Sequence, residues 1–192
     1  MTSILKESLI AAIRVKEMIL GDEQILNLTE EAAYRITDSL KKGHRVLFCG
    51  NGGSAADAQH LAAELSGRFY LERKALNAEA ININIPFLTA VSNDYDFGYS
   101  YARYLEGAAA PGDVLVLLST SGNSQNIVRA AEYAADNGIF IISLTGKTGG
   151  KLAGIADLPI KVPSEDTPRI QEAHMLLGHA ICQMVEKQIF QE

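Results

Sequence analysis

The chain has 192 residues, of which 47% are hydrophobic and 21% are charged, and its formal net charge at pH 7 is -6. This length and composition are those of one globular domain with enough apolar residues for a sizeable core. The acidic balance argues against a nucleic-acid partner, because nonspecific binding to DNA or RNA requires a basic surface. A small phosphorylated ligand is still allowed, since a few backbone N–H groups can bind it.

The start of the sequence lacks the pattern of a secretory signal peptide, and no apolar run approaches the length that spans a membrane. The two cysteines, Cys49 and Cys182, are far apart and form no CxxC pair. Cys49 lies in an apolar run, which is typical of a buried thiol in a reducing compartment. We therefore expect a soluble cytoplasmic protein with no membrane partner.

Residues 1–43 predict two helices. Apolar residues recur at helical spacing up to Leu20, Gly21 and Asp22 then break the pattern, and the second helix stops at Gly43. The two helices carry more apolar surface than one face of a small domain needs. They could form a subunit interface or simply cover one face of a sheet, and the sequence leaves both interpretations open.

After Gly43, short apolar runs alternate with helical stretches. Runs this continuously apolar are typical of strands buried on both faces, as in a parallel sheet covered by helices. The alternation predicts a doubly wound, flavodoxin-like α/β fold with a five-stranded parallel sheet, formed as a single domain over residues 1–192. The expected strands are 45–50, 78–83, 114–119, 139–144 and 158–162, and the expected helices are 54–66, 86–109 in pieces, 124–137, a short 149–155, and 168–190.

The first notable loop, CGNGGS, leads from the strand at 45–50 into a helix. Its glycines permit unusual backbone angles, and Ser54 is expected to cap the helix with Asp57 as a capping-box-like partner. The loop is neither a GxGxxG fingerprint nor a GK[ST] loop, which argues against a nucleotide cofactor. Taken alone, a GNGGS turn is more often structural than functional.

The second loop, LSTSGNSQN, follows the strand at 114–119 and places several hydroxyl groups around the start of a helix at Ser124. Exposed N–H groups and the helix dipole favour an anion there. The hydroxyl groups are more numerous than a helix cap needs, so we favour a phosphate site. They belong to Ser119, Thr120, Ser121 and Ser124.

A third loop, at 91–100, contains Asn93 and Asp94, which could bind sugar hydroxyls or make an ordinary turn. On the helix after the glycine turn, His60 and Glu64 are four residues apart and share one face. The last helix adds Gln171, His174 and His179. Each histidine alone would be read as a core residue, but together these groups suggest a metal site, an acid–base pair, or both.

These motifs resemble the phosphoheptose isomerases, members of the sugar isomerase (SIS) domain family. The resemblance rests on the glycine turn followed by HLAAEL, on STSGNS, on LTGKTGGK at 144–151 and on RIQEAHMLLGH at 169–179. It covers essentially the whole chain. It implies a cytoplasmic homotetramer whose N-terminal helices lie in the interfaces and whose sites are built between subunits. It also implies conversion of D-sedoheptulose 7-phosphate into D-glycero-D-manno-heptose 7-phosphate, the first step of ADP- or GDP-heptose biosynthesis for lipopolysaccharide or other surface glycans.

The resemblance further implies Glu64 as catalytic base, His179 as catalytic acid, and one zinc ion per subunit held by His60, Glu64, Gln171 and His179. The implied substrate contacts are Asn51, Gly52, Gly53, Ser54, Glu64, Arg68, Asn93, Asp94, Ser119, Thr120, Ser121, Ser124 and Gln171. One carboxylate that acts as base on carbon and one imidazole that transfers a proton between the oxygens suffice for an enediol mechanism. A carboxylate bound to zinc is a weaker base, so Glu64 cannot easily fill both roles at once.

Two alternative functions compete with the phosphoheptose isomerase interpretation. A non-enzymatic relative binds phosphosugars or the bacterial replication initiator, but that branch lacks the counterparts of Glu64 and His179, both present here. The other rival is an isomerase of a different phosphosugar, because the motifs indicate the phosphate and the enediol chemistry better than the length of the sugar.

Overall fold

A parallel sheet of five strands forms the centre of the computed structural model, which describes residues 3–191. The strands are β1 (Val46–Gly50), β2 (Ala78–Ala80), β3 (Val114–Ser119), β4 (Phe140–Thr145) and β5 (Leu158–Lys161). They lie in the order β2-β1-β3-β4-β5, and every neighbouring pair is parallel. The expected doubly wound, flavodoxin-like sheet is confirmed.

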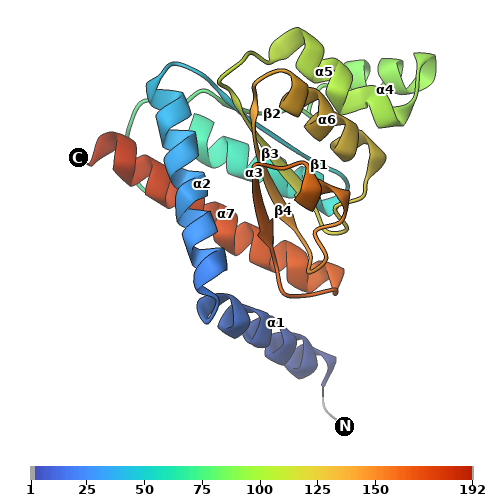
Figure 1. The fold of residues 1–192 in the computed structure, drawn as a ribbon. Helices are drawn as coiled ribbons and strands as arrows, with labels where there is room; N and C mark the ends of the chain where they lie inside the picture. The colour runs from blue at the N-terminus through green and yellow to red at the C-terminus, as the bar shows by residue number, and fades with distance from the viewer. Residues whose placement is uncertain (1–2, 192) are drawn as a thin grey trace.

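Helices cover both faces of this sheet (Figure 1), because side chains alternate along each strand. In β1, Val46 and Phe48 belong to one apolar cluster, whereas Leu47 and Cys49 belong to the other. The first cluster packs under α2 (Glu23–Lys41), α3 (Gly53–Ser66) and α7 (Thr167–Phe190), and the second under α5 (Ser100–Ala108) and α6 (Gln125–Asp136). All residues of β1 and β3 are buried, as the continuous apolar runs predicted.

Several boundaries differ from the expected ones. The second strand ends at Ala80 rather than at residue 83, because a turn follows and the Asn84 side chain accepts the backbone N–H of Phe87 to begin α4 (Ile85–Asp94). The region expected as helix in pieces consists of α4, the 3-10 turn η1 (Phe97–Tyr99) and α5. A second 3-10 turn, η2 (Lys151–Gly154), occupies the short predicted helix.

The two N-terminal helices have different surroundings. In α2, Ile25 and Ile36 are buried in the cluster on the sheet, so this helix covers one face. In contrast, α1 (Ile4–Leu20) projects from the body of the molecule (Figure 1) and buries only Val15 and Ile19. Although α1 exposes many apolar side chains, no helix within residues 3–191 combines the length and apolarity needed to cross a membrane.

Candidate active site

The glycine turn and the hydroxyl-rich loop lie at the same edge of the sheet. Strands β1 and β3 are hydrogen-bonded neighbours, and their last paired residues are Gly50 and Leu118. The helix after β1 packs on one face of the sheet and the helix after β3 packs on the other, so the two loops diverge from this point. Such a switch in the direction of winding leaves a crevice at the carboxyl ends of the strands, where ligands bind in open α/β sheets.

The glycine turn is built differently from the expected cap. Helix α3 starts at Gly53, with Gly52 as its N-cap at φ 55° and no side-chain hydrogen bond, so the predicted cap at Ser54 is wrong. Ser54 lies inside the first turn of the helix. Packing explains why residue 50 is glycine, because a Cβ there would lie 2.3 Å from the carbonyl oxygen of Ser54. The close approach of strand to helix excludes any larger residue.

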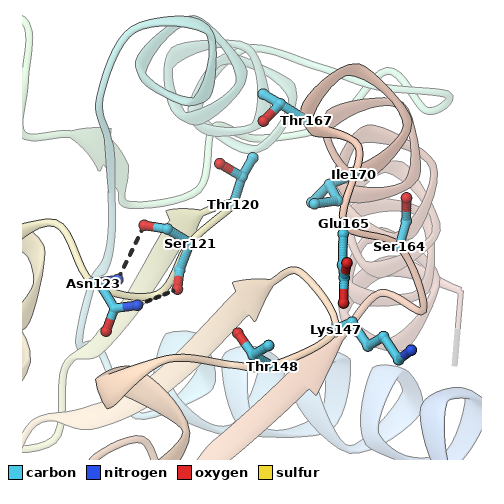
Figure 2. A pocket seen from close by; sticks show the side chains of 9 residues that line it. All are labelled: Thr120, Ser121, Asn123, Lys147, Thr148, Ser164, Glu165, Thr167 and Ile170. Atoms are coloured by element: carbon cyan, nitrogen blue, oxygen red, sulfur yellow. Dashed lines mark hydrogen bonds between the residues drawn. The ribbon is translucent and has the colours of Figure 1, made fainter.

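The hydroxyl-rich loop keeps its side chains available for a ligand. Ser124 is the N-cap of α6, as predicted, yet its hydroxyl makes no capping hydrogen bond. The Ser119 and Ser121 hydroxyls accept the backbone N–H groups of Gly122 and Asn123, at 3.2 Å in each case. Figure 2 shows Ser121 and Asn123 side by side in this loop. Because accepting a hydrogen bond leaves the hydroxyl proton free, both serines can still donate to an anion.

A cavity of about 220 Å³ lies between these loops and the start of α7. It is lined by Asn51, Ser54, Leu118, Ser119, Thr120, Ser124, Thr167 and Gln171. A second cavity of about 260 Å³ (Figure 2) shares Thr120 and Thr167 with it and extends towards Lys147. The first cavity therefore joins the glycine turn, the hydroxyl-rich loop and Gln171, which the sequence assigned to one site.

Helices α3 and α7 bring together three of the four side chains that the sequence grouped, whereas the fourth, Gln171, lines the cavity. His60 Nε2 lies 2.9 Å from Glu64 Oε1 and 3.0 Å from His179 Nε2. The ligand atoms of all three residues lie within 4.8 Å of one another. The ring of Phe69 stacks on that of His179, with 5.6 Å between the centroids. His60 is exposed, whereas Glu64 and His179 are partly buried, so the cluster is open to a ligand.

Comparison with known proteins agrees with this geometry. The SIS domain pattern matches residues 17–146. The phosphoheptose isomerase of Aneurinibacillus thermoaerophilus is 45% identical over 190 residues, which cover 99% of this chain and 96% of that protein. The chain belongs to the phosphoheptose isomerase family.

Two solved structures support the assignment to the phosphoheptose isomerases. The phosphoheptose isomerase GmhA of Neisseria gonorrhoeae has a TM-score of 0.88 and 38% identity, covering 95% of this chain and 99% of that one. A phosphoheptose isomerase from Francisella tularensis has a TM-score of 0.92 and 33% identity, covering 97% of this chain and 100% of that one. Since coverage is nearly complete in both directions, the likeness includes the N-terminal helices.

Six residues that the family resemblance assigned to the substrate line neither cavity in this chain: Gly52 and Gly53 of the glycine turn, Glu64 of the ionisable cluster, and Arg68, Asn93 and Asp94. Arg68 is exposed, and its Nε lies 3.9 Å from Glu72 Oε2. Asn93 and Asp94 form the last turn of α4 rather than a loop, and Asn93 Nδ2 donates to Asp94 Oδ1 at 2.9 Å. Arg68, Asn93 and Asp94 are all exposed in the single chain.

The structure adds polar residues that sequence reasoning missed. Thr167 borders both cavities at the start of α7; its position just before Pro168 was the available signal, because proline favours the first turn of a helix. Asp57, expected to take part in helix capping, instead has an oxygen, Oδ2, that is buried without a hydrogen-bond partner among the described residues. Burial raises the pKa of the Asp57 carboxyl, and the nearby His60 opposes this.

Proposed function

We propose that this chain is an aldose–ketose isomerase that converts D-sedoheptulose 7-phosphate into D-glycero-D-manno-heptose 7-phosphate. The observation that carries the proposal is the meeting of Glu64, His60 and His179 on two helices that border the hydroxyl-lined cavity. Relatives named phosphoheptose isomerase, matched over nearly the whole chain, support it. The reaction would be the first step of ADP- or GDP-heptose biosynthesis.

In the proposed reaction, the loop of Ser119, Thr120, Ser121 and Ser124 binds the phosphate and orients the far end of the sugar. Glu64 removes a proton from C1 of the ketose, which gives an enediol, and returns a proton to C2. The His179 imidazole moves the proton between O1 and O2 as the carbonyl migrates. One base and one acid of these types are sufficient for the two proton transfers.

Substrate contacts are assigned to the cavity residues Asn51, Ser54 and Gln171, together with Gly52 and Gly53 of the turn. Arg68, Asn93 and Asp94 are assigned to a site completed by a neighbouring subunit, because they are exposed and stand outside the cavity of one chain. A homotetramer with residues 1–43 in its interfaces would provide such neighbours. The exposed apolar side chains of α1 support that assembly.

The cluster suits a zinc ion. Its donor atoms are two imidazole nitrogens and one carboxylate oxygen, which are common zinc ligands. Ligands at 2.0–2.1 Å from a tetrahedral ion stand about 3.3 Å apart, close to the 2.9 and 3.0 Å found here. We assign the ion to His60, Glu64, Gln171 and His179. When bound, zinc would hold the pocket in shape or polarise the oxygens of the sugar, and Glu64 would be released on substrate binding.

Metal analysis tests the zinc assignment separately from activity. We expect about one zinc per chain by mass spectrometry, and much less in His60→Ala. Added zinc should raise the unfolding temperature of the unmodified protein but not that of the variant, because a ligand stabilises only the state that binds it. Equal zinc content in both proteins would remove His60 from the ligand set. Activity that stays the same or rises after zinc is stripped would exclude a catalytic requirement.

The isomerase activity is tested by incubation with sedoheptulose 7-phosphate in D₂O, followed by NMR, beside Glu64→Gln. We expect the aldoheptose phosphate only with the unmodified protein, with some deuterium at C2. The amide of Gln cannot accept the C1 proton, so the variant should lose activity while it still binds the sugar. Tight binding without turnover by the unmodified protein would favour a non-enzymatic binding protein or an isomerase of another phosphosugar.

We also place the protein in the cytoplasm, where such phosphosugars are made. Cys49 and Cys182 are both free and buried. Burial raises the pKa of the Cys182 thiol to about 12 and raises that of Cys49 still further. Unreactive buried thiols of this kind suit a reducing compartment.

A further inference from the structure

The glycine turn and the hydroxyl-rich loop are joined by a reciprocal pair of amide side chains. Asn51 Nδ2 donates to Asn126 Oδ1 at 2.8 Å, and Asn126 Nδ2 donates to Asn51 Oδ1 at 2.9 Å. Asn126 lies in the first turn of α6 and is only 2% exposed, whereas Asn51 borders the cavity. The two loops that line the cavity are thus hydrogen-bonded to each other through these side chains.

The direction of this pair is fixed by the backbone. The N–H of Ile127 donates to Asn126 Oδ1 at 3.0 Å, and a backbone N–H can only donate. The oxygen of Asn126 must therefore face Ile127, which turns its Nδ2 towards Asn51. Because Asn126 offers one donor and one acceptor in fixed places, the amide of Asn51 has only one orientation that satisfies both.

The oxygen of Asn51 is turned into the interior. Besides Asn126, it faces the hydroxyl of Tyr101 at 3.3 Å, and this tyrosine is 3% exposed. The same hydroxyl donates to the carbonyl oxygen of Gly50 at 2.7 Å. Burial raises the pKa of Tyr101, so the hydroxyl stays protonated. The Asn51 oxygen is occupied, while the second N–H of its Nδ2 has no partner among residues 3–191.

We propose that Asn126 is a positioning residue that sets the polarity of Asn51, so that the free N–H of Asn51 faces the cavity and donates to an oxygen of the sugar. The proposal rests on the function proposed above. The phosphate already has the hydroxyl-rich loop, and Asn51 lines the same cavity together with Gln171 of α7, so we assign the Asn51 N–H to the sugar. Without Asn126, the Asn51 amide could rotate and present its oxygen instead.

Two substitutions separate polarity from charge. In Asn126→Asp, the acid suits the first turn of a helix, so the protein should fold, but it offers no donor to the Asn51 oxygen. Asn126→Ala removes both partners without adding charge. We expect kcat/KM for sedoheptulose 7-phosphate to fall about tenfold in both variants, the effect of one lost hydrogen bond to the sugar. Inhibition by inorganic phosphate should change less than about twofold in Asn126→Ala.

Asn137→Ala is the control, because it removes an amide side chain at the other end of α6, where the Asn137 Nδ2 donates to the Tyr133 carbonyl oxygen at 2.8 Å at the surface. It should leave kcat/KM unchanged. A loss confined to Asn126→Asp would mean charge repulsion and would overturn the proposal. So would an equal loss of phosphate inhibition and kcat/KM in Asn126→Ala, which would indicate a displaced loop.

A crystal structure of the unmodified protein with sedoheptulose 7-phosphate decides the matter without any variant. We expect Asn51 Nδ2 within hydrogen-bond distance of a sugar oxygen, and contact through the Asn51 oxygen, or none, would overturn the proposal. Calorimetry with the same sugar phosphate separates this inference from the proposed function. Binding without turnover by the unmodified protein would refute the proposed isomerase function. Even then, a tenfold weaker affinity in Asn126→Ala would support the role of Asn126, and an unchanged affinity would refute that role.

Discussion

Glu186 Oε1 and Arg73 Nε lie 3.0 Å apart in an ion pair whose two side chains are each only 2% exposed. Glu186 also accepts the backbone N–H groups of residues 69–71, from 2.9 to 3.3 Å. Arg73 donates in turn to the carbonyl oxygens of Glu64 and Leu65 at the end of α3. One buried pair therefore ties α7, which carries His179, to the helix that carries Glu64.

Replacing Glu186 by Gln should destabilise the protein strongly, because it leaves a buried guanidinium without its carboxylate. Breaking a buried pair in this way costs about 3–5 kcal/mol. The matched control is Glu31→Gln, since Glu31 pairs with Arg35 at the surface and such pairs contribute less than about 1 kcal/mol. Urea unfolding of both variants gives the comparison. Equal, small losses would show that the backbone N–H groups alone hold this loop.

His174 should make stability depend on pH between 6.5 and 4. The side chain is completely buried in α7, and burial lowers its pKa from 6.5 to about 4 although the Thr145 carbonyl oxygen lies 3.2 Å from Nε2. Below pH 6.5 the unfolded chain takes up a proton that the folded chain does not. The contribution of His174 to the free energy of unfolding is therefore complete above pH 6.5 and is lost as pH falls towards 4, by up to about 1.4 kcal/mol per pH unit.

Urea unfolding at pH 7, 6 and 5 and at one protein concentration checks this expectation. His174→Gln can still donate to the Thr145 carbonyl oxygen but does not titrate, so its stability should fall less steeply with pH. Parallel curves for the two proteins would place the pH dependence on other groups. Glu186 contributes to the pH dependence at lower pH than His174, because its pKa is below the usual value. Burial raises this pKa, but the hydrogen bonds that Glu186 accepts, from Leu71 N–H and Arg73 above all, lower it by more.

Gly53→Ala should damage the site without unfolding the protein. The backbone of Gly53 has no positive φ, and a Cβ there would lie 2.6 Å from Nε2 of Gln171, the mobile end of a side chain. Gln171 would have to move out of the cavity. Displacement of a positioning group by about 1 Å can cost about 100-fold in rate, and we expect a loss of about 10- to 100-fold in kcat/KM.

Gly107→Ala provides the control for Gly53→Ala. Gly107 is also helical, and a Cβ there would meet nothing within 4 Å. It should keep full activity and gain a few tenths of a kcal/mol, because alanine favours a helix over glycine. Unchanged activity in Gly53→Ala, with an unchanged unfolding temperature, would show that Gln171 does not contribute from its present position.

Charges on the exposed face of α1 should dissociate the proposed homotetramer. Leu9 and Ile13 are 54% and 53% exposed in the single chain, so Leu9→Glu with Ile13→Glu should not disturb the fold. In an interface the same change buries two unpaired charges, which is strongly unfavourable. Sedimentation velocity should give about four times 20.7 kDa for the unmodified protein and for a Lys16→Glu control, and a smaller mass for the variant. A tetrameric variant would place the interface elsewhere.

Local patterns in the sequence determined much of this protein. The continuous apolar runs indicated strands buried on both faces, and the helical spacing of His60 and Glu64 placed them on one face, where they lie 2.9 Å apart. The accumulation of hydroxyl groups before Ser124 pointed to the loop that lines the cavity. Each of these features depends on residues close together in the chain, so periodicity and residue type suffice to predict it.

Other features were decided only by tertiary structure, because they depend on residues far apart in the chain. The pairing of Asn51 with Asn126, the closure of Glu186 on Arg73 and the meeting of His60 with His179 all follow from strand order and helix packing. The cap of α3 also differed from the sequence pattern, because the chain turns into the helix through Gly52 at φ 55°, a left-handed conformation that favours glycine, and Ser54 therefore lies inside the first turn and borders the cavity.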